Sequence, residues 1–182
     1  MSSIGGSNSN RNSWGYNVAM RISLSKGRAY TVVDDADFES LNQYKWHIVG
    51  GKYAARRLSP SKEYPSGEYI YMHRQIMDTP KDRDTDHING DGLDNRRGNL
   101  RICTTHQNLG NKGKMSFNTS GFKGVTISKG RFIAQIGWRE NGIRKNKVLG
   151  IFDNPIDAAK AYDKAAKQRY GDFAWLNLGE RG

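Results

Sequence analysis

The stretch that decides the fold is D-H-I-N-G-D-G-L-D-N-R-R-G-N-L-R-I-C-T-T-H-Q-N, which runs from Asp86 to Asn108. An Asp-His pair stands at the end of a short segment that alternates polar and apolar residues. The residues from Asn89 to Gly98 are dense in Gly, Asn and Asp, a composition typical of loops. Leu100 to Cys103 is a second short apolar run. The pattern predicts a β-hairpin with a long, irregular turn.

A helix is expected directly after this hairpin. Thr104, with Gln107 three residues later, matches a capping box, in which each side chain bonds to the other residue's backbone N–H. The helix would then carry Asn108 in about its first turn. Strand, loop, strand and helix form a ββα unit, whose geometry brings Asp86, His87 and Asn108 within reach of one another.

The chemistry of these three residues indicates phosphodiester hydrolysis. Carboxylate and amide oxygens are hard ligands that suit Mg²⁺ or Mn²⁺, ions that keep positions open for water and phosphate. The imidazole of His87 could accept a proton from the attacking water near neutral pH.

This segment resembles the metal-binding motif of HNH endonucleases, particularly the phage and intron-encoded homing branch. The resemblance implies that His87 is the general base and that Asp86 and Asn108 bind one Mg²⁺ or Mn²⁺ ion. It also implies that Asn99 is the central Asn, whose side chain braces the ends of the long loop. The third motif position is often His but is Asn108 here, which shifts the expected ion away from Zn²⁺.

Composition indicates a polyanionic partner. The chain has 182 residues, a net charge of +11 and a pI of about 9.8, and double-stranded DNA is the simplest candidate. It has no apolar run long enough for a membrane span, and residues 1–15 are expected to form a disordered tail without a signal peptide. The single cysteine, Cys103, excludes a Cys-based zinc ribbon and is interpreted as a packing residue. We therefore expect an intracellular, cytoplasmic protein.

The rest of residues 16–112 is expected to be a β-hairpin scaffold for the nuclease motif. Hairpins are predicted over 18–33 and 46–57, a short helix over 37–44, and a strand followed by a helical stretch over 69–77. Basic residues that could contact phosphate here are Arg56, Arg57, Lys62 and Arg74. Structural roles are favoured for the remaining histidines, His47, His73 and His106.

Residues 113–120 are short, polar and rich in Gly, Lys, Ser and Asn, which is typical of a flexible linker. Residues 121–182 form a second predicted module. Three extended segments, 122–127, 131–138 and 144–151, are separated by tight-turn signals and predict an antiparallel meander. A helix over 155–170 follows, with Asn154 as its N-cap. The predicted fold class is therefore α+β, a ββα-metal nuclease followed by a three-stranded antiparallel sheet packed on one helix.

One face of this second sheet is expected to bind DNA through basic and polar side chains. These are Lys123, Lys129, Arg131, Gln135, Trp138, Arg139, Arg144, Lys145 and Lys147. The span from Gly121 to Asn177 resembles the ethylene-response-factor, or APETALA-type, DNA-binding domain, through the motifs F-K-G-V, R-F-I-A-Q-I, L-G-I-F-D and A-A-K-A-Y-D-K-A-A. Thr126 and Gly137 stand where that family commonly has Arg, so the resemblance does not transfer base specificity.

The sequence thus favours a site-specific DNA endonuclease of the homing type. A single copy of each module favours a monomer on an asymmetric site, with cleavage of one strand or both. Two alternatives remain open at this point. The first is a DNA-binding regulator with an inactive nuclease motif, and the second is a protein that binds structured RNA through basic and aromatic surfaces.

Overall fold

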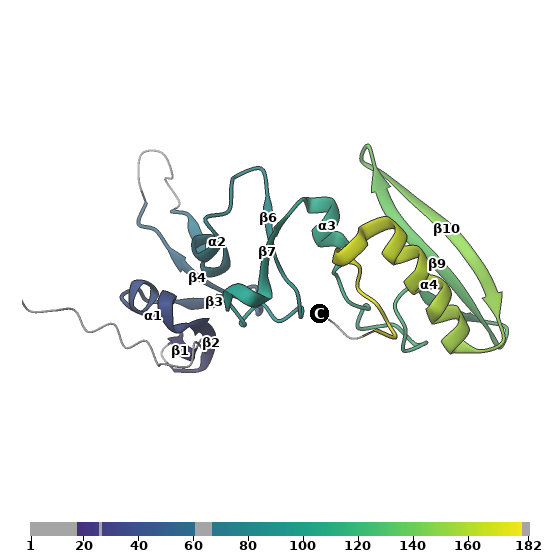
Figure 1. Cartoon of the computed structure of the whole chain (residues 1–182), viewed down its shortest axis with the longest axis horizontal. Coiled ribbons are helices and arrows are strands. Elements are labelled where there is room, and N and C mark those ends of the chain that lie inside the picture. Colours follow the sequence, from purple (N-terminus) through teal and green to yellow (C-terminus); the bar gives the residue numbers. More distant parts are fainter. Residues whose placement is uncertain (1–17, 26, 61–66, 180–182) are drawn as a thin grey trace, which may run out of the picture.

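A computed structural model describes residues 18–25, 27–60 and 67–179. The predicted tail over 1–15 and the candidate phosphate contact Lys62 lie outside these residues. The described chain is mixed α and β with several small antiparallel sheets, which agrees with the predicted α+β class. The N-terminal half, up to α3, lies at one end of an elongated molecule and the C-terminal sheet at the other (Figure 1).

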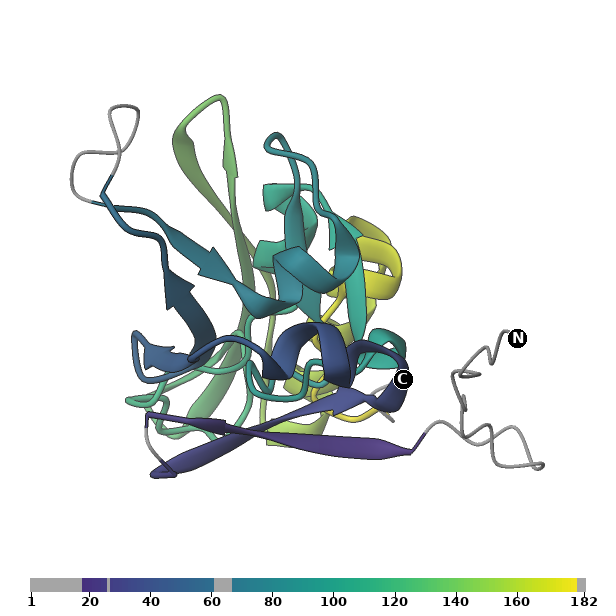
Figure 2. The ribbon, with the colours of Figure 1, turned by 90° about the vertical axis from the view of Figure 1, so that its left-hand side faces the viewer.

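The N-terminal half opens with a hairpin, as predicted. Strand β1 (Ala19–Leu24) pairs with β2 (Ala29–Asp34), and helix α1 (Asp35–Asn42) begins two residues earlier than expected. A second sheet has the order β3-β4-β5 (His47–Val49, Tyr53–Arg57 and Tyr69–Tyr71) and leads into helix α2 (Met72–Met77). Viewed along the long axis, these elements lie in front of the C-terminal half (Figure 2).

Trp46 is at the centre of the N-terminal core. Only 2% of its surface is exposed, and its indole N–H donates to the Leu41 carbonyl at 2.8 Å. It packs in one cluster with side chains from the first hairpin and from α2, including Ile22, Val33 and Met72. The apolar alternation of the two hairpins therefore joins them into one core that supports the segment from Asp86 to Asn108.

The predicted ββα unit is present. Strand β6 (Asp84–His87) pairs antiparallel with β7 (Leu100–Cys103), and the 3₁₀ turn η1 (Arg97–Asn99) closes the loop between them. Helix α3 (Thr105–Gly110) follows with Thr104 as its N-cap. The capping box is confirmed, because Gln107 N donates to Thr104 Oγ1 at 3.2 Å and Thr104 N donates to Gln107 Oε1 at 2.8 Å.

The C-terminal half forms a three-stranded sheet on one long helix. The sheet order is β10-β9-β8, from β8 (Val125–Ser128), β9 (Arg131–Glu140) and β10 (Ile143–Phe152). Helix α4 (Pro155–Tyr170) has the predicted bounds and the predicted Asn154 cap, and the 3₁₀ turn η2 (Gly171–Phe173) follows it. The Tyr162 ring of α4 packs directly on Gly124, just before β8, where an added Cβ would lie 2.0 Å from it.

The two halves are in direct contact. Gly110, at the end of α3, lies against α4, where an added Cβ would come within 2.7 Å of the Tyr170 ring. Its carbonyl oxygen accepts hydrogen bonds from Trp175 N at 3.1 Å and Lys123 Nζ at 2.9 Å. Residues 113–120, predicted as a linker, contain no helix or strand. No helix in the described ranges has both the length and the apolar character that crossing a membrane requires.

Replacing the cap residue tests how firmly α3 is held. Thr104→Ala removes the hydroxyl that accepts from Gln107 N, and we expect the free energy of unfolding to fall by about 1 kcal/mol. Thr104→Ser retains the hydroxyl, and its free energy of unfolding should lie within a few tenths of a kcal/mol of the wild-type value. Urea unfolding followed by circular dichroism measures both variants, and an equal loss in the two would contradict the capping role.

Candidate active site

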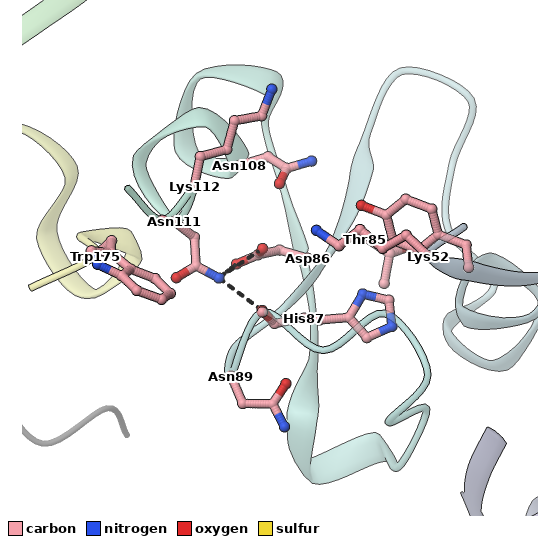
Figure 3. A pocket seen from close by; sticks show the side chains of 12 residues that line it. Lys52, Thr85, Asp86, His87, Asn89, Asn108, Asn111, Lys112 and Trp175 are labelled. Carbon is pink, nitrogen blue, oxygen red and sulfur yellow. Dashed lines mark hydrogen bonds between the residues drawn. The ribbon is translucent and has the colours of Figure 1, made fainter. Parts of the chain in front are cut away.

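A cavity of about 540 Å³ lies where the ββα unit meets the C-terminal half. Asp86, His87 and Asn108, which the sequence predicted to converge, all line it (Figure 3). The other lining residues are Lys52, Tyr53, Thr85, Asn89, Gly90, Asn111, Lys112, Gly113 and Trp175.

The carboxylate of Asp86 is held from two directions. The β6–β7 register places Arg101 directly opposite, and its Nε and its second amino group each reach Asp86 Oδ2, at 2.9 and 2.8 Å. From the C-cap of α3, Asn111 Nδ2 donates to Asp86 Oδ1 at 2.9 Å and to Oδ2 at 3.1 Å. With 5% of its surface exposed, Asp86 is a buried carboxylate in a fixed orientation.

Asn111 is a site residue that the sequence analysis missed. Its Nδ2 also donates to the backbone carbonyl of His87 at 2.8 Å, so it ties the end of α3 to the end of β6 (Figure 3). It follows Asn108 by three residues, and side chains at that spacing share a helix face. That spacing was the signal that could have identified it.

A chain of buried hydrogen bonds fixes the imidazole of His87. His87 Nε2 lies 3.1 Å from Asn95 Oδ1, Asn95 Nδ2 donates to Thr31 Oγ1 at 2.7 Å, and Thr31 Oγ1 donates to the Leu93 carbonyl at 2.7 Å. Because the amide nitrogen of Asn95 donates to Thr31, the amide oxygen of Asn95 must face His87. The proton of the imidazole is therefore on His87 Nε2. Nδ1 is thereby left as the proton acceptor of the ring.

Burial keeps His87 neutral. It lowers the pKa of the imidazole below its usual 6.5, against the opposing effects of the Asn95 bond and the nearby Asp86 charge. The ring packs 5.8 Å from Tyr53 and 5.0 Å from His73. His73 is buried as well, and burial, followed by the charges of His87 and Arg74, lowers its pKa to about 3. Two neutral imidazoles therefore lie side by side at neutral pH.

Asn99 spans the long loop between β6 and β7. Its Oδ1 accepts from Asn89 N at 3.0 Å, and its Nδ2 donates to the Asp94 carbonyl at 2.7 Å. Asp94 in turn forms a salt bridge with Arg96 at 2.6 Å, which lowers the Asp94 carboxyl pKa chiefly through that hydrogen bond. These contacts hold the loop that carries Asn95.

Asn108 lies at the pocket edge beside Asp86. Its Nδ2 donates to Asp84 Oδ2 at 3.2 Å, and its amide oxygen points toward Asp86 (Figure 3). Within the described part of the chain there is no cluster of three or more His, Cys, Asp or Glu side chains that could hold a metal. The donors available are one carboxylate and one amide oxygen, a hard and sparse set that fits Mg²⁺ or Mn²⁺ better than Zn²⁺.

Among the predicted phosphate contacts that the structure describes, Arg56, Arg57 and Arg74 do not line this pocket. Arg74 donates to the carbonyls of Arg83 and Pro80, both at 2.8 Å. The Arg56 guanidinium lies over the Tyr44 ring at 4.1 Å, and that of Arg57 lies near Tyr69. The cationic residues that do line the pocket are Lys52 and Lys112, which the sequence did not single out.

The predicted DNA-binding residues divide between the two faces of the C-terminal sheet. Alternate residues of one strand share a face, which places Arg131, Gln135 and Arg139 of β9 together, and cross-strand pairing adds Arg144 opposite Arg139. Lys129 lies in the exposed turn before β9. Lys145 and Lys147 pair with Trp138 and Ile136, so both belong to the face on which α4 packs, although their side chains are exposed on the edge strand β10.

Trp138 and Lys123 also lie away from the face of Arg131, Gln135 and Arg139. Trp138 lies on the helix side of the sheet, beside Ile136 and 4.1 Å from the Arg169 guanidinium. Lys123 points toward the Gly110 carbonyl, and burial lowers the pKa of its amine to about 8.

Cys103 has the environment of a packing residue. It is 2% exposed, and burial, together with the nearby Asp86 and Asp84 charges, raises the pKa of its thiol to about 11. A thiol with so high a pKa is a poor nucleophile near neutral pH.

Comparison with known proteins gives one distant relative. A protein of Acanthamoeba polyphaga mimivirus, named an uncharacterized HNH endonuclease, is 28% identical over 145 residues, which cover 75% of this chain and 68% of the relative. No protein-family model matches the chain, and no solved structure matches it.

The hydrogen-bond chain to His87 predicts a single imidazole tautomer. We expect ¹⁵N NMR of the wild type to show that the His87 imidazole is protonated at Nε2 and that it remains neutral below pH 6.5. Asn95→Leu removes the acceptor and leaves the buried Thr31 hydroxyl with one partner fewer, so the tautomers should mix and stability should fall by about 1–3 kcal/mol. An unchanged tautomer in this variant would contradict the assignment.

The buried His73 predicts a loss of stability in acid. Its pKa is about 3 in the folded chain and 6.5 when free, so the unfolded chain binds the proton first as the pH falls below 6.5. We expect His73 alone to cost about 2 kcal/mol of stability between pH 7 and pH 5. His73→Phe, which packs but cannot titrate, should flatten the pH dependence of urea unfolding by that amount; an unchanged slope would show that His73 is not buried in the neutral form.

Proposed function

We propose that this chain is a metal-dependent DNA endonuclease of the HNH type, in which His87 is the general base. The observation that carries the proposal is a neutral, oriented imidazole next to a buried carboxylate, inside a pocket with two lysines. The mimivirus relative, named an HNH endonuclease, supports the same class.

The chain's own residues account for proton transfer. Asn95 holds His87 with Nε2 protonated, so Nδ1 accepts a proton from a water molecule that attacks the phosphorus. The lowered pKa keeps that nitrogen unprotonated at neutral pH. Asp86 and Asn108 would bind one Mg²⁺ or Mn²⁺ ion, which supplies positive charge to the phosphate and the leaving 3′ oxygen. The products would carry 5′-phosphate and 3′-hydroxyl ends.

The lysines at the pocket suit a polyanionic backbone. Lys52 comes from the β3–β4 turn and Lys112 from just beyond α3, so two separate elements bring positive charge to one cavity. A neighbouring cavity of about 440 Å³ shares Lys112 and Gly113 with the first and is also lined by Gln135 and Arg144. We infer that duplex DNA lies along the outer face of the C-terminal sheet and continues past Lys112 to the pocket.

The finer features of the proposal rest on the family resemblances. We propose that the nuclease part spans residues 16–112 and that residues 121–182 form a DNA reader of the ethylene-response-factor type, with 113–120 between them. We also propose a homing-type enzyme that acts as a monomer on an asymmetric site and cuts one or both strands.

One observation favours a second candidate. Arg101 and Asn111 already occupy the Asp86 carboxylate, and an ion would have to compete with the Arg101 charge there. A DNA-binding regulator that does not cleave is consistent with this pairing. Cleavage assays separate the two candidates.

Replacing the proposed base tests the mechanism. His87→Ala should lower DNA cleavage by about 100-fold or more, the usual contribution of a general base, and leave DNA retention in a mobility-shift assay unchanged. His47→Ala is the matched control, because His47 is exposed on β3 and does not line the pocket. A His87→Ala variant that cuts at the wild-type rate, in the same metal and salt, would overturn the assignment of the base.

A further inference from the structure

The segment after α4 is fastened to the nuclease half beside the candidate active site. Arg101, which pairs with Asp86, donates through its other amino group to the Asp172 carbonyl at 2.8 Å, and its guanidinium lies 4.0 Å from the centre of the Phe173 ring. Trp175 N donates to the Gly110 carbonyl at 3.1 Å. The chain from Asp172 to Trp175 is therefore held at both ends.

This anchoring brings the indole of Trp175 to a wall of the pocket. In Figure 3 the ring approaches the cavity from the C-terminal segment, on the side away from Lys52. Gly113 leaves room for it, since a Cβ there would lie 3.2 Å from the ring, and a Cβ at Gly90 would be in ordinary van der Waals contact with it at 3.6 Å. Trp175 is partly exposed, so part of the ring remains accessible from the pocket.

We propose that Trp175 binds the substrate, packing its ring against a nucleotide base or sugar next to the phosphodiester in the pocket. This inference rests on the proposed function. Lys52 and Lys112 provide charge for phosphates, but a nucleotide also has the face of its base and the carbon edge of its sugar, which an aromatic ring can contact. The indole is the large aromatic group that the C-terminal half brings to this cavity.

The inference gives the C-terminal half a second role. A reader module that only tethers DNA would affect binding but would contribute no group at the cleaved bond. Here the same segment braces Arg101 against Asp86 and places Trp175 at the pocket. The cleavage site is therefore complete only when the C-terminal segment is docked.

Conservative and non-conservative variants test this role through steady-state cleavage. Trp175→Leu fills much of the same space without a ring, and we expect kcat/KM for a DNA duplex carrying the cleaved site to fall about tenfold or more. Trp175→Phe retains a ring and should remain within about threefold of the wild type. Equal kcat/KM for Trp175→Leu and the wild type would overturn the proposal, and so would an equal loss of kcat/KM in Trp175→Leu and Trp175→Phe.

A binding measurement tests the contact without cleavage. In EDTA, a 30-base-pair duplex of mixed sequence at low salt should quench the tryptophan emission of the wild type more than that of Trp175→Phe, since the other three tryptophans remain in both proteins. Equal quenching would contradict the contact. If the wild type cuts no DNA with any ion, the proposed function fails, whereas this measurement still decides whether Trp175 meets DNA.

Discussion

The carboxylate of Asp86 is the point on which the site depends. Arg101 from the paired strand and Asn111 from beyond α3 both bond to it, so one buried anion joins β6, β7 and the end of the helix. A buried carboxylate without partners would be strongly unfavourable, and these partners make its burial tolerable. Through Arg101 the same anion reaches the Asp172 carbonyl, and the C-terminal half is held to the N-terminal half.

The first hairpin acts on the site at a distance. Thr31 on β2 is fully buried and accepts from Asn95, whose oxygen then faces His87. The scaffold therefore determines which nitrogen of the imidazole can accept a proton. An imidazole in the other tautomer would present a donor to the pocket, and proton abstraction would fail although every site residue was present.

The local part of this architecture could be predicted from the sequence. The capping box at Thr104, the β6–β7 hairpin and the bounds of α4 depend on residues close in the chain, and these predictions are confirmed. The sequence-based prediction placed Trp138 on the basic face because the residues around it are basic and polar. Period-two alternation with the buried Ile136 would have placed it on the helix side.

The contacts that complete the site join distant residues. Thr31 and Asn95 are separated by 64 residues, and Arg101 and Asp172 by 71, so no spacing or motif in the sequence indicates that they meet. Trp175 belongs to the same class, since its place at the pocket follows from the docking of the C-terminal half. Burial of the imidazoles also depends on the assembled core, which is why the lowered pKa of His73 could not be foreseen.

The most direct test of the central claim is incubation of the purified chain with a supercoiled plasmid that carries its native flanking DNA, in Mg²⁺, Mn²⁺ or EDTA. We expect nicked or linear product with one or both ions and none with EDTA. Salt-sensitive retention of the plasmid without cleavage under any of these conditions would contradict the nuclease and favour the DNA-binding regulator.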